Sequence, residues 1–213
     1  MSLSKFAFAL VLAVGSAAMA NPVTVHFNRI TNNGPENPAS QLSAVISDAG
    51  NNQVTVRFLN DVSSGMAGSI TDVYFDDGTL MGISTITSSA GVNFSQGASP
   101  ADLPGGNGVN PAFETTQGFS ADSNSPTTAN GVNASSEWLD VTFNLINNKT
   151  FADTIEALNT GELRIGMHVQ AIGLQGNSEG FVNTPPTVLV PAPAAASMGL
   201  VGLGLVATRR RRK

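Results

Sequence analysis

Residues 139–145 read Leu139-Asp140-Val141-Thr142-Phe143-Asn144-Leu145, so apolar and polar side chains alternate without a break. Successive side chains of a β-strand point to opposite faces, and this alternation is typical of a strand with one buried and one wet face. The same period of two recurs in other segments. Their alternating positions are Val23, Val25 and Phe27; Leu42, Ala44 and Ile46; Val54, Val56 and Phe58; Thr71, Val73 and Phe75; and Leu163, Ile165, Met167, Val169 and Ala171.

Turn-forming residues separate these segments, as in Asp48-Ala49-Gly50-Asn51-Asn52, Asp76-Asp77-Gly78 and Gly173 to Gly176. Many short alternating strands without intervening helices are typical of an antiparallel sandwich or jelly roll. We therefore predict an all-β fold, an antiparallel β-sandwich of jelly-roll type, formed by one domain over residues 21–183.

One segment departs from the period of two. Thr150 offers a capping hydroxyl, Asp153 follows three residues later, and an apolar periodic stretch ends at Gly161. This order predicts one short helix that leads into the strand beginning at Leu163.

The stretch from Ser95 to Ser136 is rich in Gly, Ser, Asn, Pro, Ala and Thr. A connection of this length is a functional loop, an excursion across the sandwich or a partly disordered segment. Its two aromatic residues, Phe113 and Phe119, indicate that part of it is held against the body.

Composition excludes several classes of site. The chain has no cysteine, which excludes a disulfide framework, a thiol nucleophile and a cysteine-ligated zinc. Between the two ends lie all fifteen acidic residues but only four cations, a formal charge of −11. Nucleic acid is bound through Lys and Arg, so this body excludes nucleic-acid binding and favours divalent cations or neutral glycans as ligands. The four cations are Arg29, Arg57, Lys149 and Arg164.

The first twenty residues have the three parts of a secretory signal peptide. Lys5 precedes the apolar run from Phe6 to Val14, and the small-residue triplet Ala18-Met19-Ala20 closes the segment. We predict a signal peptide over residues 1–20 that signal peptidase removes after Ala20, with a buried N-terminal helix as the alternative.

The other end carries a second targeting pattern after a linker at residues 184–190. Pro191, Ala192 and Pro193 precede an apolar run from 194 to 207. Cations after an apolar run stop it in a bilayer with the charges on the cytoplasmic side. The run is shorter than the ~20 residues of a comfortable span, and snorkelling cations extend its reach. The cations are Arg209, Arg210, Arg211, Arg212 and Lys213.

Residues 191–213 resemble the PEP-CTERM sorting signal of exported bacterial proteins, with Ala192 where Glu is usual. The body is similar to a β-rich domain found ahead of such signals, in residues 69–77, 94–100, 103–106 and 163–170. The resemblance implies that an exosortase-type membrane enzyme processes the chain near Pro-x-Pro after transient insertion in the inner membrane. It also implies a final location on the outer surface or in an exopolysaccharide or biofilm matrix.

Gly176-Asn177-Ser178-Glu179-Gly180 matches the G-x-S-x-G pattern of a hydrolase nucleophile elbow. Such an elbow leads from a strand into a helix, and residues 181–186 do not form a helical pattern. His26 and His168 both precede the serine, and we expect them in surface or inter-strand roles. The chain thus presents no catalytic set, and we predict that it is not an enzyme.

Asp72, Asp76 and Asp77 could offer oxygen ligands to calcium. Ordinary turn chemistry at Asp76-Asp77-Gly78 is the competing interpretation. Trp138 and Tyr74 are expected at the core or its edge rather than as a sugar platform. No other cofactor is predicted.

Two functional hypotheses follow. The first is an exported, C-terminally sorted cell-surface or matrix protein without catalytic activity. The alternative is a polysaccharide-binding module that uses the long stretch between residues 95 and 136, with calcium at Asp72, Asp76 and Asp77 as a candidate ligand.

Overall fold

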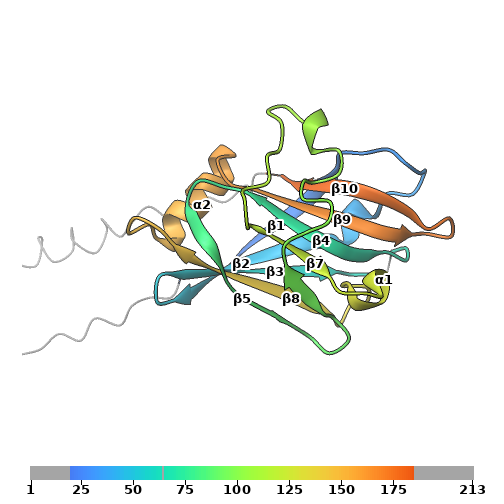
Figure 1. Ribbon diagram of the computed structural model, residues 1–213, viewed down its shortest axis with the longest axis horizontal. Helices are drawn as coiled ribbons and strands as arrows, with labels where there is room; N and C mark the ends of the chain where they lie inside the picture. Colours follow the sequence, from blue (N-terminus) through green and yellow to red (C-terminus); the bar gives the residue numbers. More distant parts are fainter. Residues whose placement is uncertain (1–19, 64, 185–213) are drawn as a thin grey trace, which may run out of the picture.

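The computed structural model describes residues 20–63 and 65–184 (Figure 1). These residues form ten strands, two α-helices and two short 3-10 turns, at Pro38–Gln41 and Gly106–Gly108. The helices are α1 (Thr127–Asn130) and α2 (Phe151–Thr160). The strands are β1 (Val23–Arg29), β2 (Leu42–Gly50), β3 (Gln53–Asn60), β4 (Ser69–Asp76), β5 (Leu80–Ser88), β6 (Phe94–Gln96), β7 (Ser120–Ser123), β8 (Trp138–Leu145), β9 (Arg164–Ile172) and β10 (Asn177–Asn183).

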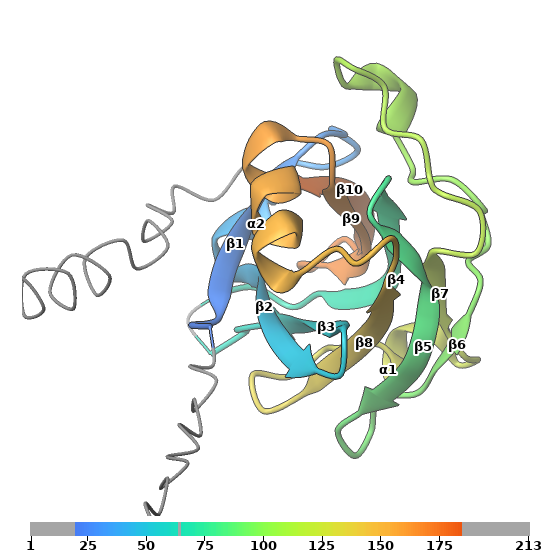
Figure 2. The ribbon, with the colours of Figure 1, turned by 90° about the vertical axis from the view of Figure 1, so that its left-hand side faces the viewer.

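All paired strands run antiparallel, in the order β5-β8-β3-β2-β1-β10-β9-β4-β7-β6. Strand β1 joins two halves, because Val23–His26 pair with β2 while Phe27–Arg29 pair with β10. The outermost strands β5 and β6 contact each other, so the sheet nearly closes on itself, as Figure 2 shows from one end. The predicted all-β, antiparallel class is confirmed.

The interior of the nearly closed sheet is filled by the apolar side chains that alternate along its strands. Phe143 lies at the centre, with its ring centroid 4.6 Å from that of Phe75 and 5.6 Å from that of Phe119, both edge to face. Edge-to-face rings add about 0.5–1.5 kcal/mol to the free energy of burial. The period-two segments of β1, β2, β3 and β8 therefore bury the face that the sequence predicts.

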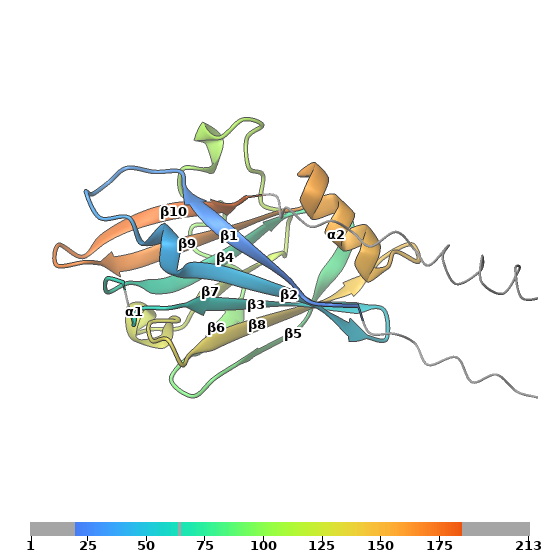
Figure 3. The same ribbon diagram turned by 180° about the vertical axis from the view of Figure 1, so that it is seen from behind.

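Helix α2 closes one end of the sheet, where Figures 2 and 3 show it lying across the opening. Thr150 and Asp153 form a reciprocal capping box, and Gly161 ends the helix with a left-handed φ of 79°. Ile155 and Leu158 are buried in the same core cluster as the strands. The predicted helix and its caps are confirmed by α2, whereas the four-residue helix α1 was not predicted.

A long connection between β6 and β7 crosses the outside of the sheet (Figure 2). We call residues 97–119 the strap. Leu103 and Phe113 of the strap form a second apolar cluster with Tyr74 and Val182 on the outer side of the sheet. Phe119 packs into the main core, so the prediction that both phenylalanines hold this segment in place is confirmed.

The strap lies close to strands β9 and β10, and glycines in these strands leave room for it. A Cβ added to Gly166 would come within 2.7 Å of Leu103, and one added to Gly180 within 2.2 Å of the carbonyl oxygen of Pro104. Real Cβ atoms essentially never come within 3 Å of a neighbouring atom, so a side chain at Gly180 would displace the backbone of the strap, and one at Gly166 would displace the side chain of Leu103.

The targeting segments lie outside the described residues. The signal peptide ends at the edge of the described part, and the sorting motif Pro191, Ala192 and Pro193 with the cations at 209–213 falls wholly beyond it. Within residues 20–63 and 65–184, no helix has the length and apolar character needed to cross a membrane.

Candidate functional site

Three titratable side chains stand side by side on strands β7, β4 and β9. The strand register pairs Asp72 with Asp122 on one side and with His168 on the other. Directly opposed residues of antiparallel strands have Cβ atoms about 4.5–5.5 Å apart on one face. Val73 faces the core, so its neighbour Asp72 faces outward, beneath the strap. We call Asp122, Asp72 and His168 the acidic row.

The carboxylate of Asp72 is only 1% exposed, and its two oxygens differ. Oδ2 lies 2.9 Å from Nδ1 of His168 and accepts a hydrogen bond of 2.9 Å from the hydroxyl of Thr71. Oδ1 is buried and has no hydrogen-bond partner among the residues that the structure describes. A buried polar atom without a partner costs about 1–3 kcal/mol. One oxygen of Asp72 is therefore fixed by two contacts, and the other has no hydrogen-bond donor.

The carboxyl group of Asp122 lies within hydrogen-bonding reach of Asp72. Burial raises the pKa of Asp122, and the charge of Asp72 raises it further, to about 6. The backbone N–H of Ser99 and the nearby His168 act in the opposite direction. Two carboxyl groups thus face each other across neighbouring strands.

Tyr74 connects the strap to the outer face of β4, on which Asp72 also lies. Its hydroxyl donates a hydrogen bond of 3.1 Å to the carbonyl oxygen of Pro100. Burial raises the pKa of Tyr74, and the negative charges of Asp72, Asp122 and Asp102 raise it further. The phenol therefore stays protonated and remains a donor. Tyr74 is fully buried, as predicted for a core aromatic.

The structure does not bring Asp72, Asp76 and Asp77 to a common point. Asp76 forms an ion pair with Arg164 and accepts a hydrogen bond of 3.1 Å from the backbone of Glu114. Asp77 caps its own turn, because its carboxylate accepts from the backbone N–H and the hydroxyl of Thr79.

In the described part of the chain, no three His, Cys, Asp or Glu side chains are arranged to hold a metal ion. Calcium at Asp72, Asp76 and Asp77 together stays a prediction. Of the three, Asp72 alone has a buried carboxylate oxygen without a partner.

A second ordered set of polar side chains lies on the outer face of the β3–β8 pair. Each polar residue on this face of β3 contacts the residue directly opposite it on β8. We call this set of cross-strand pairs the polar ladder. Its hydroxyl pair is joined at 2.8 Å, its amide pair at 2.8 Å, and its ion pair by two hydrogen bonds of 2.7 Å. The ladder consists of Thr55 with Thr142, Gln53 with Asn144, and Arg57 with Asp140, followed by Trp138 opposite Leu59.

Trp138 is partly exposed and lies outside the core clusters. The guanidinium carbon of Arg57 sits 4.4 Å above the centroid of its ring, which is a cation–π contact. The indole is therefore an outward-facing side chain whose one face is already covered. The expectation that Trp138 lies in the core or at its edge is wrong, because the indole belongs to neither core cluster and faces outward.

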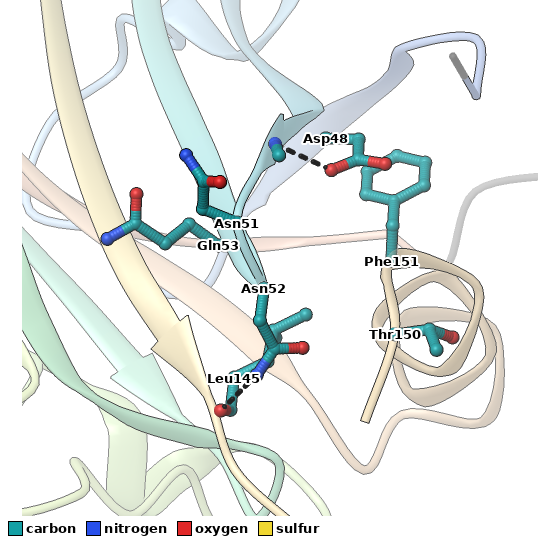
Figure 4. A pocket seen from close by; sticks show the side chains of 8 residues that line it. Asp48, Asn51, Asn52, Gln53, Leu145, Thr150 and Phe151 are labelled. Carbon is teal, nitrogen blue, oxygen red and sulfur yellow. Dashed lines mark hydrogen bonds between the residues drawn. The ribbon is translucent and has the colours of Figure 1, made fainter. Parts of the chain in front are cut away.

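An open hollow of about 230 Å³ lies between the β2–β3 turn and the start of α2 (Figure 4). Asp48 accepts a hydrogen bond from Gly50 there, and the side chain of Asn52 donates to the carbonyl of Leu145. Small-molecule sites usually span about 300–1,000 Å³ and have convergent polar groups. The polar groups here hold the turn together, which makes this hollow a feature of the hairpin.

The G-x-S-x-G segment lies at the start of β10, so Ser178 follows a tight turn and enters a strand rather than a helix. Its neighbour Glu179 is buried and accepts hydrogen bonds from the backbone N–H groups of Asn33 and Gly34. This segment thus fixes the loop after β1. His26 is exposed on β1.

Sequence reasoning missed Asp122 and the pairing of Arg57 with Asp140. Asp122 belongs to a strand of only four residues inside a stretch rich in small polar residues, which gives no period-two signal. The alternation of β3 and β8 places Arg57 and Asp140 on wet faces, but their contact depends on which strands are neighbours.

No protein-family model matches the chain, and neither a characterised protein nor a solved structure shows significant similarity to it.

Proposed function

We propose that this chain is an exported cell-surface or exopolysaccharide-matrix protein without catalytic activity, and that its body contacts neutral polysaccharide through the polar ladder. In this proposal the two halves of the sheet joined by β1 are the layers of a jelly-roll-type sandwich. Export rests on the targeting patterns of the sequence, and processing by an exosortase-type enzyme rests on the resemblance at residues 191–213.

The observation that carries the glycan proposal is the pairing within the ladder. Its hydroxyl, amide and ionic groups are held by one another, so little side-chain freedom remains to be lost when a ligand binds. Arg57 and Asp140 cancel each other's charge, which leaves a face without net charge on an acidic body. Such a face suits a neutral polymer with many hydroxyl groups and disfavours a polyanion.

Three of the described carboxylates have structural partners, which supports a non-catalytic role for them. Asp76, Asp140 and Glu179 are each paired with a cation or with backbone donors, and these contacts join neighbouring strands and loops.

Affinity electrophoresis tests the glycan proposal. The full chain, kept in mild detergent, is run in gels that contain the neutral polysaccharide fraction of the host's matrix or, separately, an acidic polysaccharide. We expect retardation by the neutral fraction, loss of it in the double variant Thr142→Ala/Asn144→Ala, and retention in the control Thr24→Ala. Equal retardation of all three proteins, or no retardation of the wild type, would remove the ladder as the binding face.

Two further measurements address the rest of the proposal. Release of reducing ends from the same polysaccharide, abolished in Ser178→Ala, would overturn the non-catalytic assignment. A reporter enzyme fused after residue 190 should be active only outside the cytoplasm, and cytoplasmic activity would remove the export assignment.

A further inference from the structure

The acidic row offers a second kind of site, independent of glycan binding. We propose that Asp72 and Asp122 together bind one divalent cation of the calcium class beneath the strap. The residues differ from the predicted triad in one essential way: the second carboxylate comes from β7, fifty residues further along the chain, and not from the turn after β4.

The buried, unpartnered oxygen of Asp72 is the first support. Thr71 and His168 both contact Oδ2, which fixes the orientation of the carboxylate, and Oδ1 is buried without a hydrogen-bond partner among the described residues. An oxygen that is removed from water and given no donor is stabilised by a cation. The arrangement resembles the general pattern in which outer contacts orient a metal-binding carboxylate.

The strand register is the second support. Asp72 and Asp122 are directly opposed residues of β4 and β7, so both carboxylates lie on the same outer face at the separation of a cross-strand pair. Like charges directly opposite each other destabilise a sheet, and a bound cation removes that repulsion.

The ligand chemistry favours a hard cation. Both groups are carboxylates, the chain has no cysteine, and Nδ1 of His168 is directed to Asp72. Oxygen ligands suit calcium and magnesium, whereas zinc prefers nitrogen and sulfur. Carbonyl groups and water complete the shell of such ions.

A bound cation would link two distant parts of the fold. Asp122 accepts a hydrogen bond from the backbone of Ser99, and Tyr74, beside Asp72 in the sequence, holds Pro100. Cation binding should therefore stabilise the strap as well as the β4–β7 pair. A proton shared between the two carboxyl groups is the competing way to satisfy Oδ1.

Calorimetry on the full chain in mild detergent tests the proposal, with CaCl₂ and MgCl₂ as probes after removal of metal by EDTA. We expect one calcium ion per chain, with a dissociation constant of about 10⁻⁴–10⁻³ M as in other extracellular calcium modules. Binding should weaken at least tenfold in Asp122→Asn. The matched control Glu156→Gln removes an exposed carboxylate on α2 and should bind calcium as the wild type does.

Limited proteolysis provides the second measurement, because calcium should slow cleavage within residues 97–119 in the wild type and in Glu156→Gln but not in Asp122→Asn. Binding of magnesium in place of calcium at the same residues still supports a site for hard cations. Absence of any binding at millimolar metal, or equal binding by Asp122→Asn and the wild type, would overturn the proposal. The first of these outcomes favours the shared proton.

Discussion

Gly180 lies directly beneath Pro104, so closely that a Cβ on Gly180 would stand 2.2 Å from the carbonyl oxygen of Pro104. The obstructing atom belongs to the backbone of the strap and cannot rotate away. We expect Gly180→Ala to lift the strap and to lower the free energy of unfolding by about 1–3 kcal/mol, as other over-packing substitutions do.

Two other glycines provide the comparison for this variant, in denaturant unfolding and in proteolysis of the strap. Gly166→Ala meets the flexible side chain of Leu103 and should be less harmful, while Gly108→Ala meets nothing within 4 Å. The expected order of damage is Gly180, then Gly166, then Gly108. If Gly180→Ala and Gly108→Ala unfolded alike, the close approach of the strap would be wrong.

The pKa of Asp122 predicts a pH dependence of stability in the absence of metal. Burial and Asp72 raise this pKa to about 6, above the ordinary value of 3.8. A group with a raised pKa in the folded state contributes stability that is complete below its unfolded pKa and is lost as the pH rises through the folded one. Between about pH 4 and pH 7, wild type in EDTA should therefore lose stability relative to Asp122→Asn, as thermal unfolding of the two proteins would show. Parallel profiles would contradict this assignment.

Glu179 of β10 should be important for the loop after β1, because it accepts hydrogen bonds from that loop. Its side chain is fully buried, accepts from the backbone N–H of Asn33 and Gly34, and lies 3.7 Å from Arg29. Glu179→Gln removes the charge and can turn an amide N–H toward these donors, so we expect a loss of about 1–3 kcal/mol in denaturant unfolding. The exposed Glu162→Gln is the control and should unfold like the wild type.

The capping box of α2 permits a finer test. Thr150 accepts the backbone N–H of Asp153, whose side chain in turn accepts from the backbone N–H of Thr150. Thr150→Ala should lower the free energy of unfolding by about 1 kcal/mol. Thr150→Ser keeps the hydroxyl and should lower it much less. Equal unfolding midpoints for the two variants would show that the cap contributes nothing.

Local patterns in the sequence predict those elements whose surroundings follow a simple rule. Strands β1, β2, β3 and β8 each have one exposed and one buried face, and α2 contains its own capping residues. Each of these elements can therefore be predicted without knowing its neighbours. The antiparallel all-β class follows from these elements together.

Irregularities in the pairing explain where the period of two fails. A bulge between Ile70 and Asp72 makes Ile70 a core residue and leaves Thr71 as the extra position. In β9, Ala171 adopts a left-handed φ of 54°, and the core position passes to Ile172. Neither feature leaves a mark in the alternation itself.

Four strands escaped prediction because other parts of the molecule determine them. The pairing of β5 is interrupted by two register shifts, β6 and β7 are three and four residues long, and β10 contains the glycine that admits the strap. The acidic row could not be predicted for the same reason, because it depends on β7 pairing with β4.

The position of β1 has a consequence for how the chain reaches its final state. Its second half pairs with β10, and the backbone of Thr184 donates a hydrogen bond of 2.9 Å to the carbonyl of His26, so the earliest and latest strands of the body are neighbours. Contacts between segments so far apart in sequence form slowly. In a polypeptide threaded through a translocation channel from its N-terminus, the second half of β1 would lack its partner until the last strand emerged.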